Sequence, residues 1–229
     1  MTTFVLVHGA FRGGWSWRRV RPLLVAAGHD VYAPSLSGAG ERASGVASVQ
    51  GLSSWVDEIV GLLEVEDLDD VVLVGHSQGA VVARAVADAV PDRLRHLVFV
   101  DGAVPDVGER AVDLTPGATG LPPRDTLIPA RPPAADGDLD AETAAWIATR
   151  LTPTPFAPSL DPRPGPASDV PVAYVFCSGT PAGYPSETTR SRLDERGTPY
   201  ALIDAGHDAP LTAPALVARS LMQVLARPA

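Results

Sequence analysis

The fold of this 229-residue chain is decided by the stretch Val71-Val72-Leu73-Val74-Gly75-His76-Ser77-Gln78-Gly79-Ala80. Four consecutive apolar residues, three of them valine, are typical of a parallel strand that is buried on both faces. An apolar helical pattern follows at once from Val81 to Val90, and Pro91 ends it. The stretch therefore predicts a strand, a sharp turn and a helix, with Ser77 at the turn.

The turn itself fits the pattern G-x-S-x-G. A serine on a sharp strand-to-helix turn has a strained backbone, so its neighbours must be small, as Gly75, Gly79 and Ala80 are. The helix that follows offers free N–H groups and a positive partial charge at its start. We therefore interpret Ser77 as a nucleophile rather than as a capping serine in a glycine-flanked turn.

Outside this stretch the same alternation continues along the chain. Short apolar runs predict strands, and apolar residues at helical spacing predict helices. The predicted strands are 4–7, 29–33, 94–100, 172–177 and 200–203, and the further helices are 15–27, 52–66 and 214–225. Strands and helices that alternate in this way predict an α/β fold with a mostly parallel sheet and helices on both faces.

Residues 103–171 interrupt the pattern, since they hold 14 of the 23 prolines and show clear helical spacing only over 141–151. A connection of this length is unusual inside a compact domain, and proline disfavours a sheet strand. We expect a small proline-rich cap over 103–171, inserted into a core formed by 1–102 and 172–229.

Composition excludes several classes of protein. A hydrophobic share of 45% indicates a globular chain, and the formal net charge of −9 argues against nucleic acid as a partner. The single cysteine, Cys177, cannot form an internal disulfide, and no apolar run is long enough to span a membrane. We expect no targeting segment, because Met1 to Thr3 lead directly into a short apolar run without a basic leader. We expect a cytoplasmic monomer or homodimer whose partner is a small-molecule substrate.

A serine hydroxyl needs a base to become a good nucleophile, and the chain has five histidines. His76 is adjacent to Ser77, and its side chain should point away from the hydroxyl. His8 is expected to brace its loop. His29 and His96 lie at the starts of predicted strands, and we expect both side chains to be solvated. His207 follows the last predicted strand, where ligands bind in open α/β sheets. His207 is therefore the predicted base. The backbone N–H groups of Ala10 and Gln78 are candidates to stabilise an oxyanion.

Several stretches give the chain a clear resemblance to the α/β-hydrolase superfamily, and within it to the small esterase branch of salicylate-binding methylesterases, hydroxynitrile lyases and EstC-like esterases. They are 4–10 with Gly14-Trp15, Gly38-Ala39-Gly40-Glu41-Arg42, 66–77 and Gly206-His207-Asp208-Ala209. The resemblance implies that Ser77 is the nucleophile and His207 the base, that Ala10 and Gln78 are the oxyanion donors, and that 103–171 is the family's cap.

The branch usually carries its triad aspartate after the strand predicted at 172–177, but this chain has no acid in 178–185. Some superfamily members take the acid from one strand earlier, where this chain has Asp101. Three alternatives remain at this point, namely Asp101, Glu187 or no orienting acid, and Asp101 is favoured. Asp208 is badly placed because it adjoins His207.

Other features separate hydrolysis from its alternatives. The branch's hydroxynitrile lyases have threonine where this chain has Gly9 and lysine where it has Asp208, so the resemblance favours hydrolysis. No cofactor motif is complete. The acids Asp136, Asp138, Asp140 and Glu142 lack the remaining residues of a calcium loop, and we interpret them as a solvated linker rather than a metal site.

The sequence thus predicts a cofactor-free serine hydrolase acting on an ester, lactone or thioester of a small apolar or aromatic, even polyketide-like, substrate. A lyase, cyclase or isomerase on the same fold, and a small-molecule-binding protein, are the alternatives. Four aromatic residues are candidates to line the pocket, or equally to pack the cap, namely Phe11, Trp146, Phe156 and Tyr184.

Overall fold

A six-stranded, entirely parallel sheet forms the centre of the computed structural model, which describes residues 1–117, 119–135 and 139–225. The strand order is β2-β1-β3-β4-β7-β8. The strands are β1 (Thr3–Val7), β2 (Asp30–Tyr32), β3 (Val71–His76), β4 (Leu94–Val100), β7 (Val172–Cys177) and β8 (Ala201–Ile203). The predicted α/β class is confirmed.

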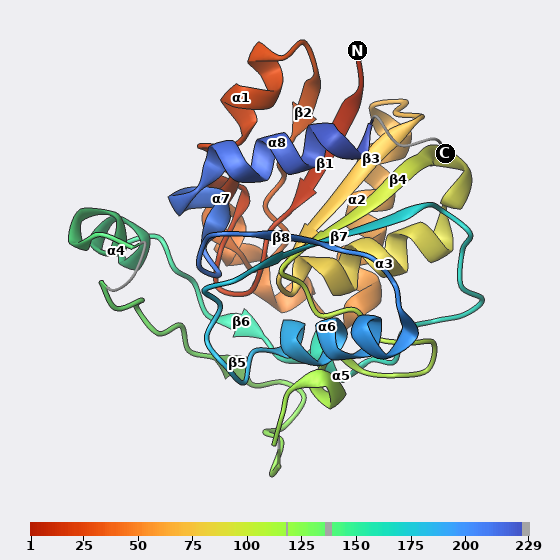
Figure 1. Cartoon of the computed structure of the whole chain (residues 1–229). Coiled ribbons are helices and arrows are strands. Elements are labelled where there is room, and N and C mark those ends of the chain that lie inside the picture. The colour runs from red at the N-terminus through yellow and green to blue at the C-terminus, as the bar shows by residue number, and fades with distance from the viewer. Residues whose placement is uncertain (118, 136–138, 226–229) are drawn as a thin grey trace.

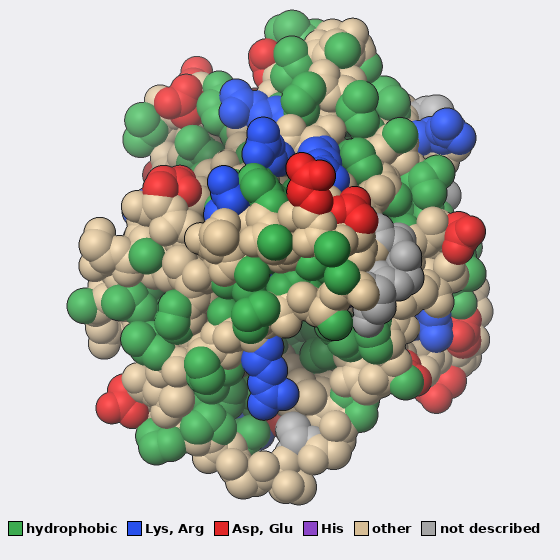
Figure 2. All heavy atoms as spheres, turned by 90° about the vertical axis from the view of Figure 1, so that its left-hand side faces the viewer, with side chains coloured by type: hydrophobic (Ala, Val, Ile, Leu, Met, Phe, Trp, Pro, Cys, Tyr) green, Lys and Arg blue, Asp and Glu red, His purple; other side chains and the backbone are tan. Residues whose placement is uncertain are grey.

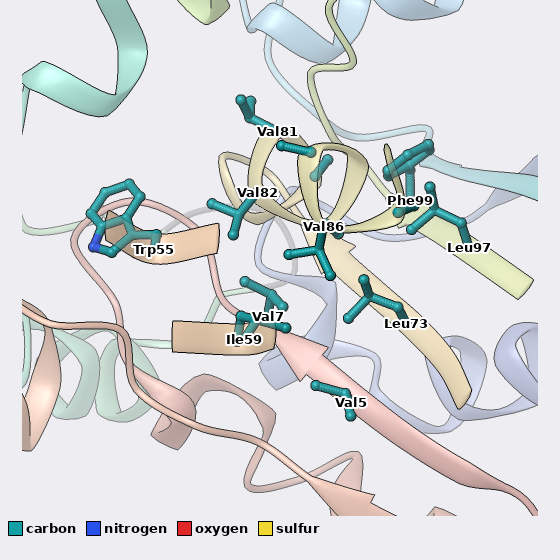
Figure 3. Packing of buried hydrophobic residues seen from close by; sticks show 14 of the residues in the cluster. Val5, Val7, Trp55, Ile59, Leu73, Val81, Val82, Val86, Leu97 and Phe99 are labelled. Atoms are coloured by element: carbon teal, nitrogen blue, oxygen red, sulfur yellow. The ribbon is translucent and has the colours of Figure 1, made fainter. Parts of the chain in front are cut away.

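Helices cover both faces of this sheet (Figure 1). On one face, α2 (Leu52–Val65) and α3 (Gly79–Ala89) contribute Trp55, Ile59 and Val86 to a buried cluster with sheet residues such as Leu73 and Phe99 (Figure 3). On the other face, α1 (Arg21–Ala26) and α8 (Pro214–Val224) pack on a second cluster. Burial on both faces explains why the strands appear as continuous apolar runs in the sequence.

The expected helix over 15–27 is divided into η1 (Gly14–Trp17) and α1. The 3₁₀ turns of this region place Trp17 and Val20 in the core, and Pro22 in the first turn of α1 marks a new helix start. His96 is also not solvated as expected, because only 3% of it is exposed. It lies on β4, a central strand whose two faces are both covered.

Residues 103–171 cross the carboxyl ends of the strands, at the bottom of Figure 1. They contain η4 (Ala111–Leu114), β5 (Leu127–Ile128), α4 (Ala141–Ala148), β6 (Thr154–Pro155) and α5 (Ala157–Leu160). The expectation that proline would prevent strands needs correction, since β5 and β6 form a two-residue antiparallel ladder that includes Pro155. This ladder is separate from the main sheet. The remaining elements are η2 (Gly40–Ser48), η3 (Pro91–Arg93), α6 (Pro185–Arg196) and α7 (Ala209–Thr212).

Side-chain hydrogen bonds hold this segment at both of its ends. Near its start, Val104 N donates to Thr189 Oγ1 of α6 at 2.9 Å. Near its end, Arg163 donates to Asp88 of α3 through Nε at 2.7 Å, and Arg84 donates to the same carboxylate at 2.6 Å. All three side chains are at most 8% exposed. Burial would raise the pKa of Asp88, but the hydrogen bonds from Arg163 and Ser168 and the charge of Arg84 hold it below its ordinary value.

Within the described ranges, no helix is both long and apolar enough to cross a bilayer.

Candidate active site

Ser77 occupies the turn between β3 and α3 with a backbone φ of 52°, in the left-handed region that a non-glycine residue rarely adopts. Its N–H donates to the carbonyl of Val100 at 3.1 Å, which fixes the turn against the neighbouring strand. A Cβ on Gly75 would lie 2.5 Å from the Gly79 carbonyl oxygen, and one on Gly79 would lie 2.5 Å from that of Val7. The glycines of the G-x-S-x-G pattern are therefore required by the close approach of backbone.

His207 and Asp101 complete a hydrogen-bonded line with Ser77. His207 Nε2 lies 3.0 Å from Ser77 Oγ, and His207 Nδ1 lies 2.6 Å from Asp101 Oδ2. Asp101 directly follows β4 and has a left-handed φ of 46°, while His207 lies in the loop after β8. Because neighbouring parallel strands end at the same edge of the sheet, residues far apart in sequence meet there.

The Asp101 carboxylate is almost completely buried, with 2% of its side chain exposed. Burial would raise its pKa, but hydrogen bonds from His207 and Thr180 more than offset this, so the pKa of Asp101 lies below its ordinary value. Glu187, the other candidate acid, instead accepts a hydrogen bond from Gly183 N at 2.8 Å. Of the acids considered from sequence, the structure thus places Asp101 on the His207 ring.

Two aromatic rings enclose His207. The His76 ring lies 5.0 Å away between centroids, and its Nε2 donates to the carbonyl oxygen of His207 at 2.8 Å. Burial, with a contribution from His207, lowers the pKa of His76 to about 3. The Tyr184 ring lies 4.5 Å from His207 on its more exposed side. A neutral, buried His76 therefore holds the backbone of His207, as its predicted orientation away from Ser77 allows.

Ala10 and Gln78, the residue that follows Ser77, line one narrow pocket. Their backbone N–H groups have no hydrogen-bond partner in the described part of the chain, whereas Ser77 N is already bonded. Gly9 lies over Ser77, because a Cβ at this position would come within 2.8 Å of Ser77 Cβ. The pocket has a free volume of about 10 Å³, which is room for about one water molecule.

Hydrogen bonds and an ion pair fix the loop that carries Ala10. His8 donates through Nδ1 to the Gly9 carbonyl and accepts from Leu36 N through Nε2, so it braces the loop as expected. Burial lowers the pKa of His8 to about 4. Arg12 donates to Asp208 through two nitrogens, at 2.8 and 2.7 Å. This bidentate pair connects the loop to the residue that follows His207, at the position where the resemblance puts a lysine in the lyases.

The four aromatic candidates separate into two groups. Phe11 lines the narrow pocket, and Tyr184 lies on His207. Trp146 instead packs on Trp15 and has guanidinium groups on its ring. Phe156 directly precedes α5 and donates its N–H to the Thr126 carbonyl. Neither Trp146 nor Phe156 lines the narrow pocket.

The surface around α4 supports this distinction. Figure 2 views the molecule from the side of α4 and shows basic side chains, all arginine in this chain, gathered on the upper half of that face. Arg18 and Arg150 are the two that lie over Trp146, at 4.9 and 4.1 Å from its ring centroid. Trp146 therefore belongs to a cationic surface rather than to an apolar pocket.

No group of three or more potential metal ligands occurs among the residues that the structure describes. Asp140 accepts from Thr143 N at 2.7 Å and so caps α4. Asp136 and Asp138, the other aspartates of the linker, lie outside the described residues.

Sequence reasoning missed three polar residues that support this site. Thr180 donates to Asp101, Arg12 pairs with Asp208, and Thr154 accepts from Phe11 N at 2.6 Å. Thr180 follows β7, where the resemblance expects an acid, so a search for any polar side chain in that loop would have found it. Nothing in the sequence marks Thr154, which comes from a stretch interpreted only as proline-rich.

A parallel sheet with a serine on its strand–helix turn and a histidine after its last strand defines the class of α/β hydrolases. The chain belongs to the alpha/beta hydrolase family, since residues 4–220 match the model of that family.

Similar proteins agree with this assignment. The chain is 43% identical over 123 residues to a carbendazim hydrolyzing esterase from Nocardioides, a match that covers 54% of this chain and 50% of that protein. It is 38% identical over 104 residues to salicylic acid-binding protein 2 of Nicotiana tabacum, over 45% and 40% of the two chains. The matches thus span half or less of these relatives. A crystal structure of an Arabidopsis methylesterase superposes with a TM-score of 0.81 at 21% identity, covering 99% of both chains, and supports the fold.

Proposed function

We propose that this protein is a cofactor-free serine hydrolase of carboxylic esters. The observation that carries the proposal is the unbroken line from Ser77 Oγ through His207 to the buried carboxylate of Asp101. Relatives named as esterases support the same reaction class. In this proposal, residues 103–171 act as the cap over the site.

The reaction begins when Ser77 Oγ attacks the acyl carbon while His207 Nε2 takes the hydroxyl proton. The acyl oxygen becomes an oxyanion held by the N–H groups of Ala10 and Gln78. Collapse breaks the ester bond, and His207 returns the proton to the leaving alcohol. Water then attacks the acyl-enzyme with His207 again as base, which releases the acid and restores Ser77. Asp101 orients His207 and stabilises the imidazolium in both halves.

We further propose a small apolar or aromatic ester, lactone or thioester as the substrate. The narrow pocket that Ala10 and Gln78 share is lined mostly by apolar groups, and Pro155 also lines a neighbouring groove of about 420 Å³. The relatives' names fit a compact aromatic molecule, since one hydrolyses carbendazim and another binds salicylic acid.

The non-hydrolytic alternatives rest on the observation that no acid follows β7. Without an orienting acid, a lyase, cyclase or isomerase, or a binding protein, would be favoured over a hydrolase. The carboxylate of Asp101 lies on the His207 ring, so an acid is available for acyl transfer. At the position of the lyase lysine this chain has Asp208, and the guanidinium of Arg12 is bound to that carboxylate.

The experiment that tests the proposal is labelling with a fluorophosphonate, followed by mass spectrometry of the intact and digested protein. We expect one adduct on Ser77 of the wild-type protein and none on Ser77→Ala. We also expect Ser77→Ala to lose roughly 10⁶-fold in kcat on p-nitrophenyl acetate, with an unchanged circular dichroism spectrum. Labelling at another residue, or hydrolysis retained in a folded Ser77→Ala, contradicts the mechanism.

A further inference from the structure

Residues 152–159 form a strap of the proposed cap. The strap is hydrogen-bonded to Gln78 and to Phe11, the residue that follows Ala10. Thr152 N donates to the carbonyl of Phe11 at 3.0 Å, and Phe11 N donates to Thr154 Oγ1 at 2.6 Å. On the opposite side, Gln78 Nε2 donates to Ser159 Oγ at 3.0 Å. The cap therefore contacts the loop that carries Ala10 and the turn that carries Gln78.

Phe11 needs this support because its φ is 64°, a conformation that costs energy for a bulky side chain. The two bonds from the strap occupy both its N–H and its carbonyl. The N–H of the preceding residue, Ala10, remains without a partner in the described part of the chain.

The hydroxyl hydrogen of Thr154 is available to donate a hydrogen bond. A threonine hydroxyl has one donor and two acceptor sites, and Thr154 Oγ1 uses an acceptor site for Phe11 N. Its own hydrogen has no acceptor among the described residues. The residue is 8% exposed, and it lines the same narrow pocket as Ala10 and Gln78. A buried donor with no partner costs free energy unless a water or a ligand accepts from it.

We propose that Thr154 is a catalytic residue, whose hydroxyl donates a third hydrogen bond to the oxyanion. The inference rests on the proposed function, since the charge it would stabilise forms only during acyl transfer. The Phe11 N–H fixes the hydroxyl oxygen, and the pairing of β6 with β5 fixes the backbone of Thr154. The donor is thus in place before the charge develops, as effective electrostatic stabilisation requires.

The test compares Thr154→Val with Thr154→Ser and with the matched control Thr152→Val. Thr152 belongs to the same strap, but its buried hydroxyl has no hydrogen-bond partner and its contact to Phe11 uses only the backbone. We expect kcat/KM on p-nitrophenyl acetate to fall about 10²-fold in Thr154→Val, as when one oxyanion donor is removed. We expect Thr154→Ser to remain within a few-fold of wild type and Thr152→Val to be unchanged.

Two further measurements separate donation from support of the fold. The affinity for a trifluoromethyl ketone, which forms a tetrahedral adduct on the nucleophile, should fall in Thr154→Val by the same factor as kcat/KM, while the affinity for the product acid stays constant. A crystal structure of this variant should retain the positive φ of Phe11. An equal loss in both affinities, a displaced Phe11 loop, or full activity in Thr154→Val overturns the inference.

The wild-type control distinguishes this result from failure of the proposed function. If wild type is labelled on Ser77 and hydrolyses the ester while Thr154→Val does so equally fast, only the role of Thr154 is wrong. If wild type shows neither labelling nor hydrolysis, the serine mechanism itself is wrong, and the role of Thr154 falls with it.

Discussion

The proposed triad and the proposed oxyanion pocket are built from different parts of the chain. Ser77, Asp101 and His207 each follow a strand of the central sheet, so strand register alone brings them together. The proposed oxyanion pocket combines the loops at Ala10 and Gln78 with the strap 152–159 of the proposed cap. Changes to the sheet ends should therefore act on proton transfer, whereas changes to the cap should act on charge stabilisation and on the integrity of the pocket.

After the loss of Ser77 itself, the largest effect is expected on the triad side, from Asp101→Asn. Loss of the carboxylate removes the group that orients and stabilises charged His207, which costs roughly 10⁴-fold in kcat in a comparable triad. Glu187→Gln is the matched control, because the Glu187 carboxylate accepts a hydrogen bond from Gly183 N. Steady-state kinetics on p-nitrophenyl acetate measure both variants. A full rate in Asp101→Asn, or an equal loss in Glu187→Gln, would assign the acid differently.

On the side of the proposed cap, the largest loss of stability is expected from Asp88→Asn. This change leaves Arg84 and Arg163 buried without their carboxylate, and breaking a buried pair costs roughly 3–5 kcal/mol. Asp69→Asn is the control, since its pair with Arg93 is exposed and worth at most about 1 kcal/mol. Urea unfolding measures the free energies. Similar values for the two variants would mean that the buried cluster does not anchor the cap.

Acid should lower the free energy of unfolding, because a buried histidine supports both regions. His76 holds the loop of His207, and His8 holds the loop that carries Ala10. The pKa of His76 is lowered to about 3 and that of His8 to about 4, both by burial. The unfolded chain takes up these protons first, so stability is complete above the ordinary histidine pKa of about 6.5 and falls as the pH decreases toward 4. Each histidine contributes up to roughly 1.4 kcal/mol per pH unit.

Measurements of the unfolding free energy between pH 6.5 and 4 test this expectation, and His8→Gln should remove about half of the histidine contribution to the slope. The carboxylates Asp101 and Asp88 add to the loss at lower pH, since their pKa values are also held below the ordinary range in the folded protein. A stability that is constant over this interval would contradict the burial of neutral imidazoles.

The smallest effect is expected from Thr180→Val, again on the triad side. The variant loses a hydrogen bond to the ionised Asp101, which raises the pKa of that carboxyl and lowers kcat about 10-fold. The acid limb of the pH–rate profile should shift to higher pH, and Thr180→Ser should restore it. A lower rate with an unshifted profile would indicate a structural role only.

The sequence predicts the proposed triad better than the proposed oxyanion pocket. The positions of Ser77 and His207, and most strand bounds, follow from apolar runs and glycine spacing, which are local. The choice of Asp101 over Glu187 requires knowing that β4 and β7 are neighbours, which the local pattern leaves open. The contact between Thr154 and Phe11 joins residues 143 positions apart through one side chain, so no periodicity reveals it.

The anchoring of the cap at Val104 and at Arg163 has a consequence for how the chain can vary. The length of chain between two fixed points has only a small entropic effect, because closing a loop of twice the length costs about 0.6 kcal/mol more. Insertions and exchanges between η4 and β5 should therefore be tolerated while both anchors, the β5–β6 pairing and the strap at 152–159 stay in place. Chimeras that exchange this interval with relatives would alter the groove of about 420 Å³ that Arg124, Asp125 and Thr126 line, and would leave the proposed triad unchanged.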